Sequence, residues 1–187
     1  MKTLLIGAFV AAVLLFGWQS LSWTALHVHD DAYLYTPAQD TLLNTLRTHL
    51  PAEGQYLVPR VPDGASADEM EKMGEQMKGK PWAVITYHPA FNNDMTTSIL
   101  RGFLIALVCA LIVCFVVQKL AIKTFGNVFA TVMSFALISF FYVWYNQHNW
   151  FDIPWSVLKG ELIDILASWG LTALWLGWWY SRRQKAR

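Results

Sequence analysis

The chain has 187 residues, of which 55% are apolar and 15% aromatic, and its formal net charge is +1. This composition fits one membrane bundle with one small water-facing module. Residues 22–98 hold five basic side chains against ten acidic ones, and such an acidic surface excludes nucleic acid as a partner.

Four apolar stretches dominate the sequence and cover residues 3–21, 99–117, 128–145 and 162–180. Each has about the 17–25 residues that a helix needs to cross the hydrocarbon core of a bilayer. The sequence therefore predicts a membrane α-helical protein, a four-transmembrane-helix bundle in the lipid bilayer with a small extracytoplasmic α/β insert between its first two helices. The expected parts are an anchor helix in residues 1–21, the insert in residues 22–98, and a three-helix transmembrane domain with a basic tail in residues 99–187.

The charges that flank these stretches indicate the orientation of the chain. If the N-terminus lies in the cytoplasm, the segments on that side contain seven Lys and Arg residues and no Asp or Glu. Basic residues in short loops near the ends of spans favour the cytoplasmic side. The sequence thus predicts a multi-pass protein with both termini in the cytoplasm and the insert outside.

The first apolar stretch permits two interpretations. Lys2, the apolar core and the small residues around Leu21 are also typical of a removable signal peptide. The stretch is long for a signal core, however, and the expected cleavage point is flanked by Trp18 and Trp23, which suit a membrane interface. We expect a retained anchor, and a cleaved first helix is the alternative.

The insert is expected to fold as helix, strand, helix and strand. Thr36 and Pro37 are a typical start of the first helix. Residues 55–58 and residues 82–87 are the two strand candidates. Between them, the sequence SADE (residues 66–69) is a capping-box signature that begins the second helix. We expect the two strands to pair in parallel around that helix.

Polar side chains inside the apolar stretches form a further pattern. Four of them share one face of the fourth stretch: Glu161, Asp164, Ser168 and Thr172. Arg101 lies at a matching depth in the second stretch. Ionisable groups inside a bilayer are costly and normally face a partner. We therefore predict a structural intramembrane polar cluster in which Arg101 pairs with Asp164 or Glu161, and a proton or ion path is the alternative.

His27 and His29, followed by Asp30 and Asp31, are a candidate metal site. In an extended segment the two imidazoles would point the same way, and with carboxylates they could hold zinc or copper. The alternative is a pair of interfacial histidines without a metal.

No other cofactor or catalytic group is expected. The sequence contains no Gly-rich phosphate loop, no Gly-x-Ser-x-Gly elbow and no His-Glu-x-x-His motif. No histidine lies within an apolar stretch, so a transmembrane haem would lack its axial ligands. We therefore do not expect an enzyme.

Several short motifs resemble a family of uncharacterised bacterial inner-membrane proteins. In that family the anchor ends in Trp-x-x-Leu-Pro-Trp-His, and this chain has WTALHVH (residues 23–29), in which His29 matches and His27 and Val28 depart. GQYLVP (54–59), KPWA (80–83) and WFDIP (150–154) are also similar. The resemblance implies four spans, a small periplasmic insert and a place in the bacterial inner (cytoplasmic) membrane. It implies no catalytic role for any residue.

Two functional hypotheses follow from these patterns. The first is a non-enzymatic accessory or assembly component that acts through a membrane or periplasmic protein partner, with the acidic insert and the aromatic outer surface as its contact sites. The alternative is a metal-handling or small-solute transport component that uses the histidines and the polar face of the fourth stretch.

Overall fold

The structure, a computed structural model, describes residues 1–185 and is mostly helical (69%). Its contacts divide the chain into two compact units, one formed by Met1–Leu34 with Asp94–Arg187 and the other by Tyr35–Asn93. The first of these, called the helical unit below, includes residues 22–34 and 94–98, which the sequence predicts as part of the insert.

Four helices in the described chain are long and apolar enough to cross a membrane, which is compatible with a multi-pass membrane protein. They comprise α1 (Lys2–Thr24), α4 (Met95–Lys119), the continuous helix Phe125–Phe151, and α7 (Trp155–Lys185). These helices contain the four apolar stretches that the sequence predicts, and each extends beyond its stretch by a few residues.

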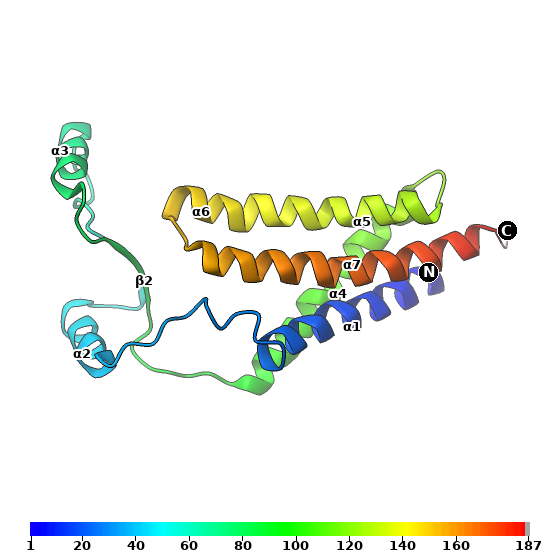
Figure 1. Cartoon of the computed structure of the whole chain (residues 1–187), viewed down its shortest axis with the longest axis horizontal. Coiled ribbons are helices and arrows are strands. Elements are labelled where there is room, and N and C mark those ends of the chain that lie inside the picture. Colours follow the sequence, from blue (N-terminus) through cyan, green and yellow to red (C-terminus); the bar gives the residue numbers. More distant parts are fainter. Residues whose placement is uncertain (186–187) are drawn as a thin grey trace. The chain divides into compact units, whose positions relative to one another are not determined.

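Small side chains allow the helices of this unit to pack closely. α1 lies against both α4 and α7, and α5 (Phe125–Ser139) runs along α7 (Figure 1). Ala8, Ala11 and Ala12 of α1 are fully buried in the shared core, where their size permits close backbone approach. A Cβ atom on Gly7 would lie 3.1 Å from Nε1 of Trp179, so this position of α1 also favours a minimal side chain.

The third long helix is not regular along its length. After α5 it continues as η1, a π-helical segment (Phe140–Tyr145), and then as α6 (Asn146–Phe151). Five of the six residues of η1 are aromatic. The helix ends at Asp152, whose left-handed φ of 45° turns the chain toward Pro154 and α7.

The second unit contains α2 (Gln39–His49), β1 (Gly54–Val58), α3 (Ala67–Met77) and β2 (Ala83–Tyr87). The predicted order of elements is confirmed. The predicted capping box is also confirmed: the Ser66 hydroxyl accepts from the Glu69 backbone N–H while the Glu69 carboxylate accepts from the Ser66 backbone N–H.

The predicted parallel pairing of the strands is wrong. β1 and β2 pair antiparallel, from Gly54 opposite Tyr87 to Val58 opposite Ala83. The connection that contains α3 therefore leaves and re-enters the sheet at the same end. A parallel pair would require that connection to cross back along the strands, and the antiparallel pair does not.

Candidate functional site

The polar face of α7 points into the helical unit. Asp164, Ser168 and Thr172 are buried, and Glu161 is partly buried. The Thr172 hydroxyl donates to the backbone carbonyl of Ser168 at 2.9 Å. Residues spaced three or four apart lie on one face of a helix, and here that face of α7 is turned toward the inside of the helical unit.

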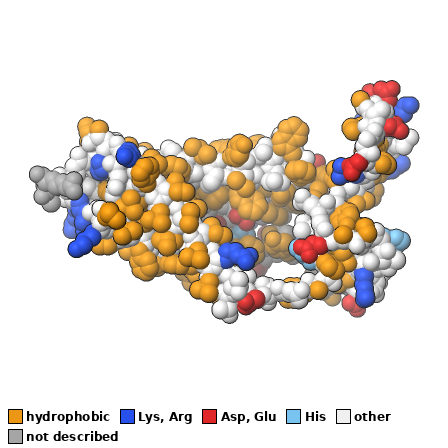
Figure 2. All heavy atoms as spheres, turned by 180° about the vertical axis from the view of Figure 1, so that it is seen from behind, with side chains coloured by type: hydrophobic (Ala, Val, Ile, Leu, Met, Phe, Trp, Pro, Cys, Tyr) orange, Lys and Arg blue, Asp and Glu red, His pale blue; other side chains and the backbone are white. Residues whose placement is uncertain are grey.

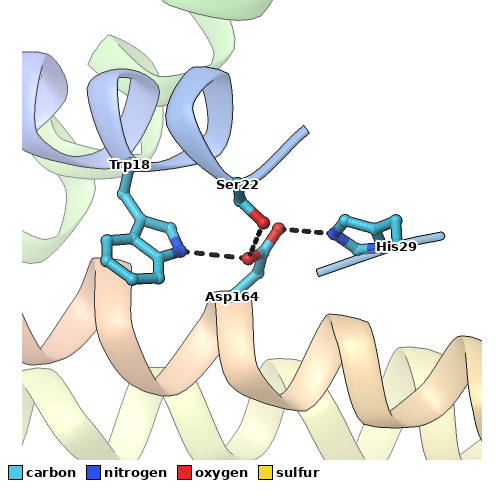
Figure 3. Close-up of polar contacts among 4 residues, drawn as sticks. All are labelled: Trp18, Ser22, His29 and Asp164. Carbon is cyan, nitrogen blue, oxygen red and sulfur yellow. Dashed lines mark hydrogen bonds and ion pairs between the residues drawn. The ribbon is translucent and has the colours of Figure 1, made fainter. Parts of the chain in front are cut away.

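Asp164 is the centre of a hydrogen-bonded cluster that joins α7 to α1 and to the turn after α1 (Figure 3). Oδ1 accepts from Trp18 Nε1 at 3.0 Å and from the Ser22 hydroxyl at 2.5 Å. Oδ2 lies 2.9 Å from Nε2 of His29. The side chains of His29 and Asp164 are only 5% and 12% exposed, so the pair is shielded from solvent.

The turn after α1 brings His29 back against α7. It begins with a left-handed residue, His27, at φ 54°, and a backbone bond from Ala32 N–H to the His29 carbonyl stabilises it. Trp23 then stacks on the His29 ring with a centroid distance of 4.1 Å and an interplanar angle of 11°. The imidazole is therefore held on one face by an indole and at its Nε2 by a carboxylate.

Gly160 provides the space for this ring. A Cβ atom at position 160 would lie 2.7 Å from His29 Nδ1 and 3.0 Å from its Cε1. Real Cβ contacts do not reach such distances, because close-packed atoms repel steeply. A side chain larger than that of glycine at this position of α7 would thus displace His29.

The cluster does not have the geometry of a catalytic triad. In a catalytic triad the base accepts the proton of the serine and the carboxylate orients the base. Here Ser22 and His29 both bond to Asp164, and no hydrogen bond joins the two within residues 1–185.

The partner of Asp164 differs from the one expected. Arg101 is exposed on α4 and forms no ion pair with Asp164 or Glu161 in the described part of the chain. The carboxylate is satisfied instead by the neutral donors Trp18 and Ser22 and by the His29 ring. Because these groups lie on α1 and its following turn, the polar contact ties α7 to α1 rather than to α4.

The two predicted metal ligands separate. His27 is 74% exposed and lies 3.3 Å from Asp30 through its Nδ1, whereas His29 is buried against Asp164. The segment is a turn and not an extended strand, so the two rings do not point the same way. Within residues 1–185, no group of three or more His, Cys, Asp or Glu side chains is arranged to hold a metal ion.

A pocket of about 190 Å³ lies beside the cluster, among α1, α4 and α7. Its polar wall includes Glu161 and Asp164, and its apolar wall includes Leu15 and Ile105. Glu161 thus shares the space next to the buried carboxylate without belonging to the hydrogen-bonded cluster drawn in Figure 3.

Two members of the cluster, Trp18 and Ser22, were not predicted as site residues. They are four positions apart and therefore lie on one face of α1, and this spacing is the sequence signal for a shared partner. Comparison of the chain with known protein families, with curated proteins and with solved structures finds no match.

Proposed function

We propose that this chain is a multi-pass protein of the bacterial inner membrane that acts without catalysis, as an accessory or assembly component, through a membrane or periplasmic protein partner. In this proposal both termini lie in the cytoplasm and residues 22–98 lie in the periplasm. The observation that supports a protein partner is the exposed apolar surface of the unit Tyr35–Asn93.

Membrane insertion and orientation are supported by the four long apolar helices and by the charges at their ends. A retained first helix is supported by its contacts. α1 supplies three buried alanines to the core, and its Trp18 and Ser22 both donate to Asp164. Removal of α1 would leave that carboxylate without two of its donors.

The unit Tyr35–Asn93 has almost no core of its own. Tyr87 is its only buried hydrophobic side chain, and α2 and α3 bury none. Leu43 is 60% exposed and Phe91 is 90% exposed. An isolated two-stranded sheet is marginal in water, and exposed apolar clusters of this kind mark surfaces that bind other molecules.

A groove gives this surface a shape that suits a peptide or helix of another protein. The groove has a volume of about 840 Å³ and lies between α2 and the segment that follows β2. Leu43 and Phe91 supply apolar contacts, while Arg47 and Glu53 add charges at its wall. Apolar centres with polar margins are typical of protein–protein contact surfaces.

Site-specific photo-crosslinking in native membranes tests this proposal. A photoreactive side chain at position 43 faces the groove, and the same side chain at the exposed position 45 lies on the opposite face of α2 as a matched control. We expect one discrete protein adduct from position 43 and none from position 45. Leu43→Asp with Phe91→Asp should abolish co-purification of the same protein. Equal labelling from both positions, or co-purification that survives the double substitution, would contradict the proposed contact surface.

A further inference from the structure

A second pocket lies at the other end of the helical unit, where α1 begins and α7 ends. It has a volume of about 620 Å³. Four segments line it: the start of α1, the end of α4, the connection between α4 and α5, and the end of α7. Their polar side chains at the pocket are Thr3, Gln118, Lys123, Tyr180, Arg183 and Gln184. Two of these side chains are cationic and none is acidic.

Arg183 is held in place at the wall of this pocket. Its guanidinium lies 3.8 Å from the centre of the Trp179 ring, and its Nη1 donates to the Thr3 hydroxyl at 3.1 Å. A guanidinium has five N–H donors, and the bond to Thr3 is the only one it makes to another side chain in residues 1–185. The remaining donors are oriented in advance by the stacking, which lowers the entropy lost when they bind an anion.

Lys123 is fixed on the connection between α4 and α5. Its ammonium donates to the Leu120 carbonyl at 2.5 Å, and its backbone N–H donates to the side-chain oxygen of Gln184. The carbonyl satisfies one of the three ammonium donors but does not neutralise the charge. The connection and the end of α7 thus present two cations to the same pocket.

No Asp or Glu side chain among the described residues lies beside these cations. Asp and Glu are absent from residues 1–29, 95–151 and 165–185, which include every residue that lines the pocket. Figure 2 shows Lys and Arg side chains gathered at this end, with apolar side chains covering the long helices beside them. A fixed pair of cations with no acidic side chain beside it in the described part of the chain is an electrostatic arrangement that recruits an anion.

Tyr180 also lines the pocket. Its side chain is 3% exposed, and its hydroxyl lies beside the side chains of Cys114 and Gln118.

From these observations we propose that the pocket binds the phosphate group of an anionic phospholipid, with Lys123 and Arg183 as its cationic ligands. A phosphate monoanion matches both the planar donor fork of arginine and the point charge of lysine. A lipid is favoured over free phosphate because the pocket lies at the ends of long apolar helices, where head groups meet a membrane protein. This inference rests on the membrane insertion proposed above.

The test uses the full chain reconstituted in phosphatidylcholine vesicles with or without phosphatidylglycerol. After flotation and mild-detergent extraction, native mass spectrometry measures the fraction of protein that retains phosphatidylglycerol. Lys123→Gln with Arg183→Gln removes both pocket cations. Lys119→Gln with Arg182→Gln is the matched control, because it removes the same charge types from exposed positions of the same end outside the pocket.

We expect the wild type and the control to retain phosphatidylglycerol in preference to phosphatidylcholine, and the pocket variant to retain about tenfold less. Lys123→Arg with Arg183→Lys, which keeps both charges, should retain it. Lys123→Gln alone should lower retention by several-fold, which covers the case in which the double variant does not fold. Equal retention by the pocket and control variants would show attraction by overall charge and overturn the site.

A second arm separates the two sources of phosphate. Inorganic phosphate is titrated into the detergent-extracted wild type. Binding of inorganic phosphate without retention of phosphatidylglycerol would assign the pocket to a soluble anion and overturn the lipid. Wild-type protein that fails to float with vesicles would overturn the proposed membrane insertion itself, and with it this inference. Protein that floats but shows no lipid preference would overturn the inference alone.

Discussion

Nε2 of His29 lies 2.9 Å from Oδ2 of Asp164, across 135 positions of sequence, in a pair whose side chains are almost fully buried. The contact fixes the turn after α1 on the face of α7. Since an ionised carboxylate is only an acceptor, His29 carries its proton on Nε2 when Asp164 is ionised. The buried pair thus sets both the position of the turn and the orientation of the ring.

Replacement of Asp164 by leucine should destabilise the helical unit. Trp18, Ser22 and His29 would lose their shared acceptor, and each buried donor left without one costs about 1–3 kcal/mol. Asp164→Asn keeps one acceptor oxygen and should cost less. Thermal unfolding of the purified protein in detergent measures the difference. Asp152→Asn, at an exposed left-handed position that asparagine tolerates, is the control. Equal unfolding temperatures for wild type and Asp164→Leu would contradict the role of the carboxylate.

Gly160→Ala should displace His29 and reproduce most of the loss caused by His29→Ala. The added Cβ would lie 2.7 Å from His29 Nδ1. Gly170→Ala is the matched control on the same helix, because no atom outside its own helical backbone lies within 4 Å of the added Cβ. That control should be neutral or stabilising by about 0.5–1 kcal/mol. A double-mutant cycle measures the coupling: Gly160→Ala should cost little once His29 is alanine. Additive effects would show that the two positions act independently.

The capping box of α3 should make that helix sensitive to acid. Hydrogen bonds from the backbone and the side chain of Ser66 hold the pKa of Glu69 below its ordinary value. A carboxyl with a lowered folded-state pKa stabilises the fold above its unfolded pKa, and that contribution is lost as pH falls through the folded-state pKa. Ser66→Ala should raise the pKa of Glu69 only part of the way, because the backbone N–H of residue 66 still donates. NMR titration of the Glu69 side chain measures this, and an unchanged pKa in the variant would contradict the side-chain contribution.

The proposed orientation predicts opposite labelling of two introduced cysteines. Met70→Cys on α3 should react with a membrane-impermeant maleimide in intact spheroplasts, and Gln184→Cys should react only after the membrane is opened. Cys109 and Cys114 lie within α4, so the unsubstituted chain reports background labelling. Reaction of positions 70 and 184 from the same side would overturn the three membrane crossings proposed between them.

The sequence predicted the four long helices because an apolar stretch of this length has few other solutions. It also predicted the start of α3, since Ser66 and Glu69 satisfy each other's backbone donors locally. Both features depend on neighbours in the chain. The direction of β2 relative to β1 does not, because it depends on the path of residues 59–82, and the strand sequences fit either direction.

The partner of Asp164 could not be derived in the same way. Hydropathy gives the depth of a group in a span, and by depth alone Arg101 was a suitable partner. The rotation of α1 and α4 about their axes decides which groups face Asp164, and that rotation is set by the packing of residues such as Ala8 and Ala11. The return of His29 depends on a left-handed turn at His27, for which the sequence has no glycine as a signal.

The π-helical segment η1 also has a consequence for how the third long helix tolerates changes in length. Its wider turn accommodates one residue more than an α-helix of the same rise. Deletion of a single aromatic residue between positions 140 and 145 should therefore restore regular α-helical geometry and leave Asn146–Phe151 facing the same way relative to α5. The same deletion in a regular α-helix rotates everything after it by about 100°. The length of this segment, and not only its apolar character, thus determines where His148 and Trp150 point.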